Sequence, residues 1–265
     1  MFESIKESSK MPVIFVGHGN PMYAITDNPF RKIWSELGKS LPVPNAVLCI
    51  SAHWVSKGTY ISSGDPLSTI YDFYGFPDEL YQVNYDVKGN PQLAESIFKS
   101  VDSFSIHKDD KRGIDHGAWS VLSNLFPNKD IPVLQLSLDM SKPASYHFKL
   151  GQALNTLREQ GVLIIGSGNV VHNLYEINWN NHAEPHSWAI EFDRLIEKAI
   201  EEDDADSMIN FADFEDIAKK AHPTIEHYLP LIYVIANRSP KDKYLIFNNS
   251  IENASLSMKS VIFWE

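Results

Sequence analysis

Three of the ten histidines lie at or just beyond short apolar runs of the kind that form buried strands. The pairs are His18 after Pro12–Val16, His53 after Ala46–Ile50, and His172 after Val162–Ile165. The carboxyl ends of parallel strands meet at one edge of an open α/β sheet, so these side chains can converge there. Neutral imidazole is the commonest protein ligand of first-row metals. The spacing therefore predicts a metal site at the carboxyl edge of a sheet.

Glycines accompany two of these histidines. Gly17 and Gly19 enclose His18, and the segment Gly166-Ser167-Gly168 precedes His172. Glycine permits a positive φ and a close approach of the backbone, which suits a tight exit from a strand. The second segment alone is equally typical of a phosphate-cradling turn. A dinucleotide site would need a third glycine in the pattern G-x-G-x-x-G, and that glycine is absent.

The remaining histidines carry weaker signals. His116 and His227 each precede an apolar segment, and Leu231–Ala236 after His227 is typical of a buried helix. Taken singly, either histidine is expected to cap, pack or bind, with a structural role preferred. The others are expected at the surface or around the site: His107, His147, His182, His186 and His222. The alternative for the whole set is an α/β domain whose histidines only satisfy local backbone groups.

Strand-like and helix-like segments alternate along the chain. A fourth buried strand is predicted at Ile131–Leu136, and helical periodicity appears in Pro29–Leu41, Pro91–Val101, Ser145–Glu159 and Trp188–Glu202. This alternation predicts an α/β fold with a central, mostly parallel sheet flanked by helices. Residues 58–90 are expected to form a smaller excursion of loops and short strands. Two late strands are predicted, Tyr244–Phe247, an edge strand, and Ser260–Trp264.

The bulk composition narrows the class of protein. With 265 residues the chain is expected to form one domain, 1–265. A formal net charge of -11 disfavours nucleic acid and anionic membranes as partners. The single cysteine, Cys49, lies in an apolar run and predicts a buried, inert thiol in a reducing compartment. No signal-peptide pattern and no bilayer-spanning run is seen, so a cytoplasmic protein is expected. The oligomeric state is left open.

Five motifs occur in an order that resembles the class III extradiol ring-cleavage dioxygenases, and within them the DOPA 4,5-dioxygenase-like subgroup of bacteria and plants. The motifs are Gly17-His18-Gly19-Asn20-Pro21-Met22, Ser51-Ala52-His53-Trp54, Asp115-His116-Gly117, Gly168-Asn169-Val170-Val171-His172-Asn173, and Pro223-Thr224-Ile225-Glu226-His227-Tyr228-Leu229-Pro230-Leu231. The likeness runs from about Pro12 to Met258, which is nearly the whole chain.

The resemblance implies roles for five histidines. His18, His53 and His227 are implied as metal ligands, and His172 as a fourth ligand or an acid/base. His116 is implied to line the pocket and to contact substrate or oxygen. Two departures are visible. Asn20 stands where serine is usual in the subgroup, and His227 stands where the wider class commonly has a glutamate.

The implied activity is O₂-dependent extradiol cleavage of a catechol, such as DOPA, at one divalent metal. Non-haem Fe(II) with open positions suits this chemistry, and Zn(II) is expected to occupy the site in purified protein because such ligands bind zinc readily. His172 is the expected acid/base, with His116 as its alternate. The aromatic segment Tyr71–Pro77 is expected either to form a wall for the substrate ring or to pack against the core. The alternatives are a zinc hydrolase that uses the same histidines and a non-catalytic homologue that binds metal or a small molecule.

Overall fold

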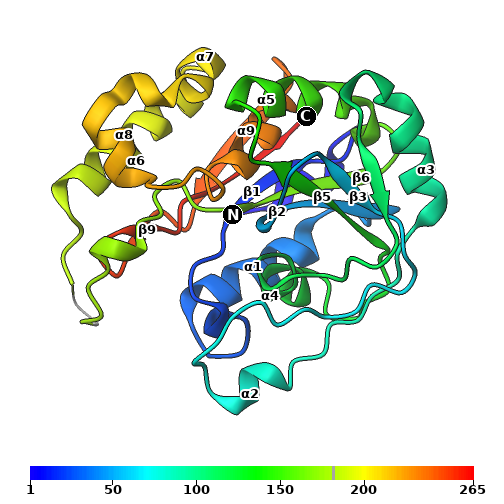
Figure 1. Cartoon of the computed structure of the whole chain (residues 1–265), viewed down its shortest axis with the longest axis horizontal. Coiled ribbons are helices and arrows are strands. Elements are labelled where there is room, and N and C mark those ends of the chain that lie inside the picture. Colours follow the sequence, from blue (N-terminus) through cyan, green and yellow to red (C-terminus); the bar gives the residue numbers. More distant parts are fainter. Residues whose placement is uncertain (181–182) are drawn as a thin grey trace.

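The apolar runs predicted as buried strands form the centre of a sheet between two helical layers (Figure 1). In the computed structural model, which describes residues 1–180 and 183–265, eight strands lie in the order β4-β3-β5-β2-β6-β1-β10-β7. Their bounds are β1 Val13–Gly17, β2 Ala46–Ser56, β3 Tyr60–Ser62, β4 His107–Asp109, β5 Val133–Asp139, β6 Val162–Gly168, β7 Lys243–Phe247 and β10 Ser260–Trp264. The central strands β5, β2, β6 and β1 pair in parallel. The predicted α/β fold is confirmed.

Alternate residues of each central strand enter opposite hydrophobic cores, because successive side chains in a strand face opposite sides of the sheet. In β1, Val13 and Phe15 pack into one core, whereas Ile14 and Val16 pack into the other. The first core is covered by α3 Pro91–Ser100, α5 Ala144–Ala153, α6 Ser187–Glu201, α7 Ala205–Ile209, α8 Glu215–Ala221 and α9 Leu229–Ala236. The second is covered by α1 Pro29–Ser40 and α4 His116–Leu125. Cys49 is a buried free thiol, and burial raises its pKa.

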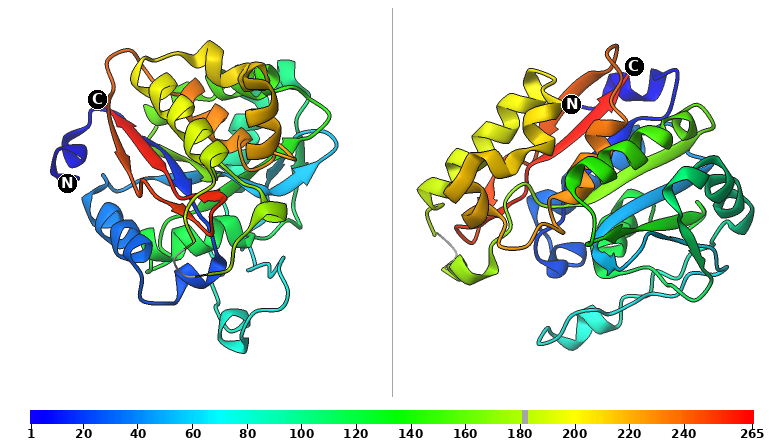
Figure 2. Two further views of the ribbon diagram at one scale, coloured as in Figure 1. Left: turned by 90° about the vertical axis from the view of Figure 1, so that its left-hand side faces the viewer. Right: turned by 45° about the horizontal axis from the view of Figure 1, so that its top comes forward.

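The C-terminal segment completes the sheet beside the N-terminal strand. Figure 2 shows β10 and β7, in red and orange, running next to β1, in blue. Both pairings are antiparallel, and β7 forms an edge of the sheet as predicted. A separate two-stranded ladder joins β8 Ile251–Glu252 to β9 Leu256–Ser257.

Two predicted elements differ in extent. β2 runs to Ser56 rather than ending at Ile50, and its register against β5 shifts between Ile50 and Val55. His53 therefore lies within an irregular stretch of a strand, not beyond its end, and such an irregularity redirects side chains. The helix predicted over Ser145–Glu159 ends at Ala153 and is followed by a 3-10 turn, η4 Asn155–Arg158. Asn and Thr at the start of that turn are poor helix formers.

The excursion over residues 58–90 contributes β3 to the main sheet and carries one short helix, α2 Asp78–Tyr81. A bridge between Leu67 and Val87 closes its base. The other short 3-10 turns are η1 Glu3–Glu7, η2 Pro21–Ala24, η3 Asp102–Phe104, η5 Leu174–Glu176 and η6 Phe211–Phe214. Across the described ranges, no helix is long and apolar enough to cross a membrane.

Candidate metal centre

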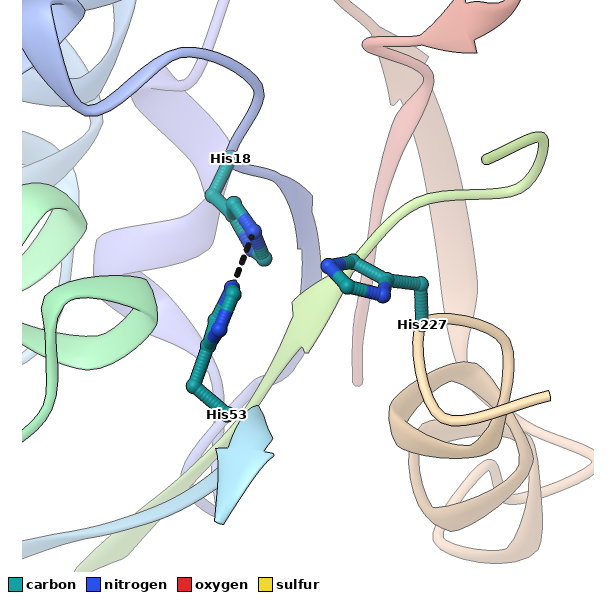
Figure 3. A group of neighbouring side chains, drawn as sticks. All are labelled: His18, His53 and His227. Atoms are coloured by element: carbon teal, nitrogen blue, oxygen red, sulfur yellow. Dashed lines mark hydrogen bonds between the residues drawn. The ribbon is translucent and has the colours of Figure 1, made fainter. Parts of the chain in front are cut away.

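Three imidazole rings converge at the carboxyl edge of the central strands. His18 follows β1, His53 lies in β2, and His227 stands just before α9. The Nε2 atoms of His18 and His53 are 3.1 Å apart. The ring centroid of His227 lies 5.3 Å from that of His18 and 5.1 Å from that of His53. Figure 3 shows the three rings around a common point, and one nitrogen from each lies within 4.8 Å of the others.

The outer nitrogen, Nδ1, of each ring has an oxygen nearby. These pairs are His18 Nδ1 with Ser167 Oγ at 3.0 Å, His227 Nδ1 with Glu226 Oε1 at 3.2 Å, and His53 Nδ1 with Asp72 Oδ2 at 3.7 Å. The Ser167 hydroxyl donates to the carbonyl of Gly117, so its oxygen accepts from His18 Nδ1. A ring that donates from Nδ1 presents the lone pair of Nε2 on its other side.

The inner nitrogens fit a bound cation. Among the described residues, the buried Nε2 of His227 has no hydrogen-bond partner. A buried polar atom without a partner costs free energy. The Nε2 atoms of His18 and His53 face each other closely, and two lone pairs in that position repel unless a proton or a metal lies between them. The three-histidine donor set therefore suits a first-row divalent metal.

The electrostatics of the site keep these rings neutral. Burial lowers the pKa of His18 and of His227 well below the usual value, and neighbouring histidines lower both further. Burial, followed by the nearby His116, lowers the pKa of His53 to about 4. Near neutral pH the three rings are therefore uncharged, which is the form that binds metals.

Close backbone contacts set the position of His227. The amide N–H of Asn169 donates to the carbonyl oxygen of His227 at 2.9 Å. A Cβ atom on Gly168 would overlap that same carbonyl, and one on Gly166 would overlap the carbonyl of Pro230. Gly168 therefore serves the close approach of the segment before α9, and Gly166 that of the first turn of α9, while a positive φ is found instead at Gly19.

A buried polar network supports the backbone of His53. The Asp115 carboxylate is fully buried and accepts from Ser51 Oγ at 2.6 Å, Arg112 Nη2 at 2.7 Å and Gln135 Nε2 at 2.7 Å. The Ser51 hydroxyl oxygen in turn accepts from the backbone N–H of His53 at 3.2 Å. Asp115 also caps α4. The sequence reasoning did not single out this network, although an aspartate directly before an apolar helix is a recognisable N-cap signal.

His116 is the first residue of α4 and approaches the site from the opposite helical layer to His227. Its ring centroid lies 3.8 Å from that of His53 and 6.1 Å from that of His18. Asp72 Oδ1 accepts from both the backbone N–H and Nδ1 of His116, each at 3.0 Å. Burial raises the pKa of Asp72, but the bonds from His116 outweigh it and hold that pKa at about 2. Phe73, from the aromatic excursion, packs edge-on against His116 with centroids 5.5 Å apart.

His172 lies beside His227 rather than in the three-histidine group. The two rings are stacked with centroids 3.4 Å apart and an interplanar angle of 5°. A nitrogen of His172 and one of His227 lie within 4.8 Å of each other and of a Glu226 oxygen. Burial, followed by the nearby His222, lowers the pKa of His172 to about 3. His222 is itself buried and donates from Nε2 to the carbonyl of Val170 at 2.7 Å.

The other candidate residues lie as follows. His107 is exposed on β4, and His186 stacks on Trp188. His147 is fully buried against Tyr233, so its expected place at the surface or around the site is wrong; its imidazole satisfies a hydroxyl and a carbonyl inside the core. His182 lies outside the described residues. Asn20 uses its side chain to cap η2, accepting from the N–H of Met22.

Comparisons with known proteins identify the family. Residues 12–255 match the family described as "Catalytic LigB subunit of aromatic ring-opening dioxygenase". The chain belongs to this family. It is 39% identical to "4,5-DOPA dioxygenase extradiol" of Escherichia coli (strain K12), over 97% of this chain and 96% of that protein. It is 37% identical to "4,5-DOPA dioxygenase extradiol" of Beta vulgaris, over 98% of this chain and 97% of that protein.

A solved structure agrees with this assignment. The crystal structure of an uncharacterised protein from Escherichia coli K12 matches with a TM-score of 0.83 and 36% identity, and covers 96% of this chain and 99% of that chain. The resemblance seen in the five motifs is confirmed, and so is the enzyme class, an aromatic ring-opening dioxygenase of the extradiol type. In this LigB-family protein the three convergent histidines form a group able to hold a metal.

Proposed function

We propose that this LigB-family protein opens a catechol ring in extradiol fashion with O₂, using one Fe(II) held by His18, His53 and His227. The observation that carries the proposal is the convergence of three neutral imidazoles, one with a buried inner nitrogen that lacks a partner among the described residues. When bound, Fe(II) supplies a Lewis acid and a redox-active centre with open positions for catecholate and O₂. The names of the two relatives make DOPA the first catechol to test.

The remaining histidines handle protons. His172 stacks on His227 beside the three-histidine group, where its ring accepts a proton from a catechol hydroxyl and later returns one. The Nδ1–H of His116 donates to the Asp72 carboxylate. The Nε2 of the same ring is therefore unprotonated and accepts a hydrogen bond from the substrate. Phe73 packs edge-on against one side of the His116 ring.

The activity is tested by anaerobic loading with Fe(II) followed by exposure of a panel of catechols to O₂. We expect O₂ uptake together with a new visible absorbance for at least one catechol. The Zn(II)-loaded protein should be inactive, because zinc has no redox chemistry. Turnover that continues without O₂ would instead support the zinc hydrolase. Catechol binding without turnover after Fe(II) loading would support the non-catalytic homologue.

The metal ligands are tested by metal content. His18→Ala and His53→Ala should each bind less than a tenth of the metal that the wild-type protein binds, because two imidazoles hold a divalent ion far less well than three. His107→Ala is the matched control, since this exposed histidine lies on edge strand β4. Stoichiometric metal in either ligand variant, measured by elemental analysis after dialysis, would contradict the assignment.

A further inference from the structure

The side chain of Asp72 lies between two histidines that come from different elements. Its Oδ1 accepts from the backbone N–H and from Nδ1 of His116, both at 3.0 Å, and its Oδ2 lies 3.7 Å from Nδ1 of His53. One carboxylate thus contacts the strand that carries a proposed ligand and the helix that carries a proposed substrate-side group. In sequence, Asp72 and His116 are 44 residues apart.

Within the described part of the chain, the Asp72 carboxylate forms ion pairs only with these two imidazoles. Its ion pairs there are with His53 and His116, and none involves a lysine or an arginine. By contrast, the buried Asp115 nearby is paired with Arg112 at 2.7 Å. A carboxylate without a permanent cation beside it acts most strongly on the polarity and orientation of its imidazole partners.

The loop that carries Asp72 is attached to α4. The indole N–H of Trp119 donates to the carbonyl of Ile70 at 2.9 Å, and the Ile70 N–H donates to the carbonyl of Ile114 at 2.8 Å. The ring of Phe73 packs edge-on against Trp119 as well as His116. These contacts on both sides of Asp72 fix its carboxylate relative to the first turn of the helix.

Asp72 also satisfies the start of α4. His116 is the first residue of that helix, and its backbone N–H has no partner within the helix. The N-cap, Asp115, accepts from Ala118, so the N–H of His116 depends on Asp72. Asp72 Oδ1 accepts hydrogen bonds from both the backbone N–H and the ring Nδ1–H of His116. These two bonds together fix the orientation of the imidazole.

We propose that Asp72 is a positioning residue for the ring-opening reaction, holding the proton of His116 on Nδ1 and leaving Nε2 as the acceptor that meets the substrate. The inference rests on the proposed function. In this arrangement His116 receives a hydrogen bond from a catechol hydroxyl and does not donate one. The contact with His53 adds a weaker orienting effect on a proposed metal ligand, in keeping with its longer distance.

The test compares Asp72→Ala with Asp72→Asn. The asparagine is isosteric and its carbonyl oxygen can still accept from Nδ1, whereas alanine removes the acceptor. Asp78→Asn is the matched control, because Asp78 is an exposed acid in the same excursion at the start of α2. The tautomer of His116 is measured from the ¹⁵N shifts of its ring in the metal-free protein, and turnover is measured separately after Fe(II) loading.

We expect wild type and Asp78→Asn to show the Nδ1–H tautomer, and Asp72→Ala to show a mixture. Turnover kcat should fall about 10- to 100-fold in Asp72→Ala and less in Asp72→Asn. An unchanged tautomer and an unchanged kcat in Asp72→Ala would overturn the proposal. If Asp72→Ala does not fold, Asp72→Asn decides: wild-type kcat in a protein whose ring proton has left Nδ1 would overturn it.

The two proposals fail in different ways. If no catechol is opened by the wild-type protein, the proposed function is wrong, while the tautomer measurement still reports on Asp72 in the metal-free protein. A role in folding alone would lower the melting temperature of Asp72→Ala without moving the ¹⁵N shifts of His116, and that result would also overturn the positioning role.

Discussion

The geometry at His172 bears on two roles, fourth ligand and acid/base, that the motif leaves open. The ring stacks on His227 at a centroid distance of 3.4 Å, and burial lowers its pKa to about 3. A nitrogen of His172 lies within 4.8 Å of potential ligand atoms of Glu226 and His227. The convergent group that could hold a metal comprises His18, His53 and His227. Because His172 lies outside the convergent group, its position favours the proposed role of proton acceptor over that of a fourth ligand.

We therefore predict that His172→Gln lowers kcat by about 10²- to 10⁴-fold while the protein keeps its metal. Glutamine preserves a polar side chain of similar length but cannot exchange a proton near neutral pH. Metal content and single-turnover kinetics measure the two effects separately. His186→Gln is the control, because His186 stacks on Trp188 outside the histidine group. Loss of the metal from His172→Gln would make His172 a ligand instead.

Residues of the site differ in how far the sequence could predict them. His18 and His172 follow predicted strands, so a periodicity argument finds them. Asp72 cannot be found in this way, because it lies in a segment without periodicity and meets His116 across 44 residues. The path of such a loop depends on its packing against α4. The periodicity of apolar residues in the sequence does not predict that packing.

At the scale of elements, Gly168 shows how a strand and a helix meet. A Cβ atom there would overlap the carbonyl oxygen of His227, which accepts a hydrogen bond from the N–H of Asn169. We predict that Gly168→Ala displaces the segment before α9, lowers metal affinity at least 10-fold and destabilises the protein by about 1–3 kcal/mol through overpacking. Isothermal titration with Zn(II) and urea unfolding measure the two quantities.

The control for this prediction is Gly58→Ala. Gly58 has φ +91°, so alanine strains the backbone there, but its nearest neighbours lie at 3.5 Å or more and belong to Tyr60 and His107. It should lower stability without changing metal affinity. Equal metal affinities in Gly168→Ala and wild type would show that the close approach to His227 is not needed to form the site.

Helices with one polar face were predictable from their periodicity. α1 and α6 have that pattern and match their predicted ranges to within a residue. The sequence did not predict α4. Eight of its ten residues are buried, but they include His116, Gly117 and Ser120, so α4 lacks the uninterrupted apolar run that predicted α9. The second residue of α4 is glycine, which disfavours a helix on propensity alone, and Gly117 is required there because a Cβ would lie 2.6 Å from the ring of His53.

At the scale of the whole molecule, the sheet joins two hydrophobic cores, and the site lies at the strand edge between their helical layers. His227 approaches from the layer of α9 and His116 from the layer of α4. That the chain folds as one domain stays a prediction, and cooperative unfolding of both cores would support it. The two cores share every central strand, since adjacent residues of one strand enter opposite cores.

The acid stability of the whole fold can be tested at His147, which is not among the histidines of the candidate metal centre. His147 is a fully buried residue of α5 that faces α9. Its Nδ1 accepts from the Tyr233 hydroxyl, and its Nε2 donates to the carbonyl of Asp139. Burial lowers its pKa to about 4, although the Asp139 carbonyl and carboxylate favour the charged form. Besides these groups, the ring of Tyr146 packs edge-on against it.

The direction of the pH effect follows from that lowered pKa. Between the unfolded value of 6.5 and about 4, the unfolded chain binds a proton at His147 and the folded protein does not. Stability from this group is therefore complete above pH 6.5 and is lost as the pH falls towards 4, by about 2 kcal/mol between pH 7 and 4.5. We predict that His147→Gln is less stable at pH 7, because two buried hydrogen bonds change, but loses about 2 kcal/mol less than wild type over this range. Urea unfolding of the metal-free proteins at both pH values measures this difference. The other buried histidines with lowered pKa contribute to both proteins alike; they are His18, His53, His172, His222 and His227. Parallel losses of stability in the two proteins would mean that His147 is not a source of the acid sensitivity.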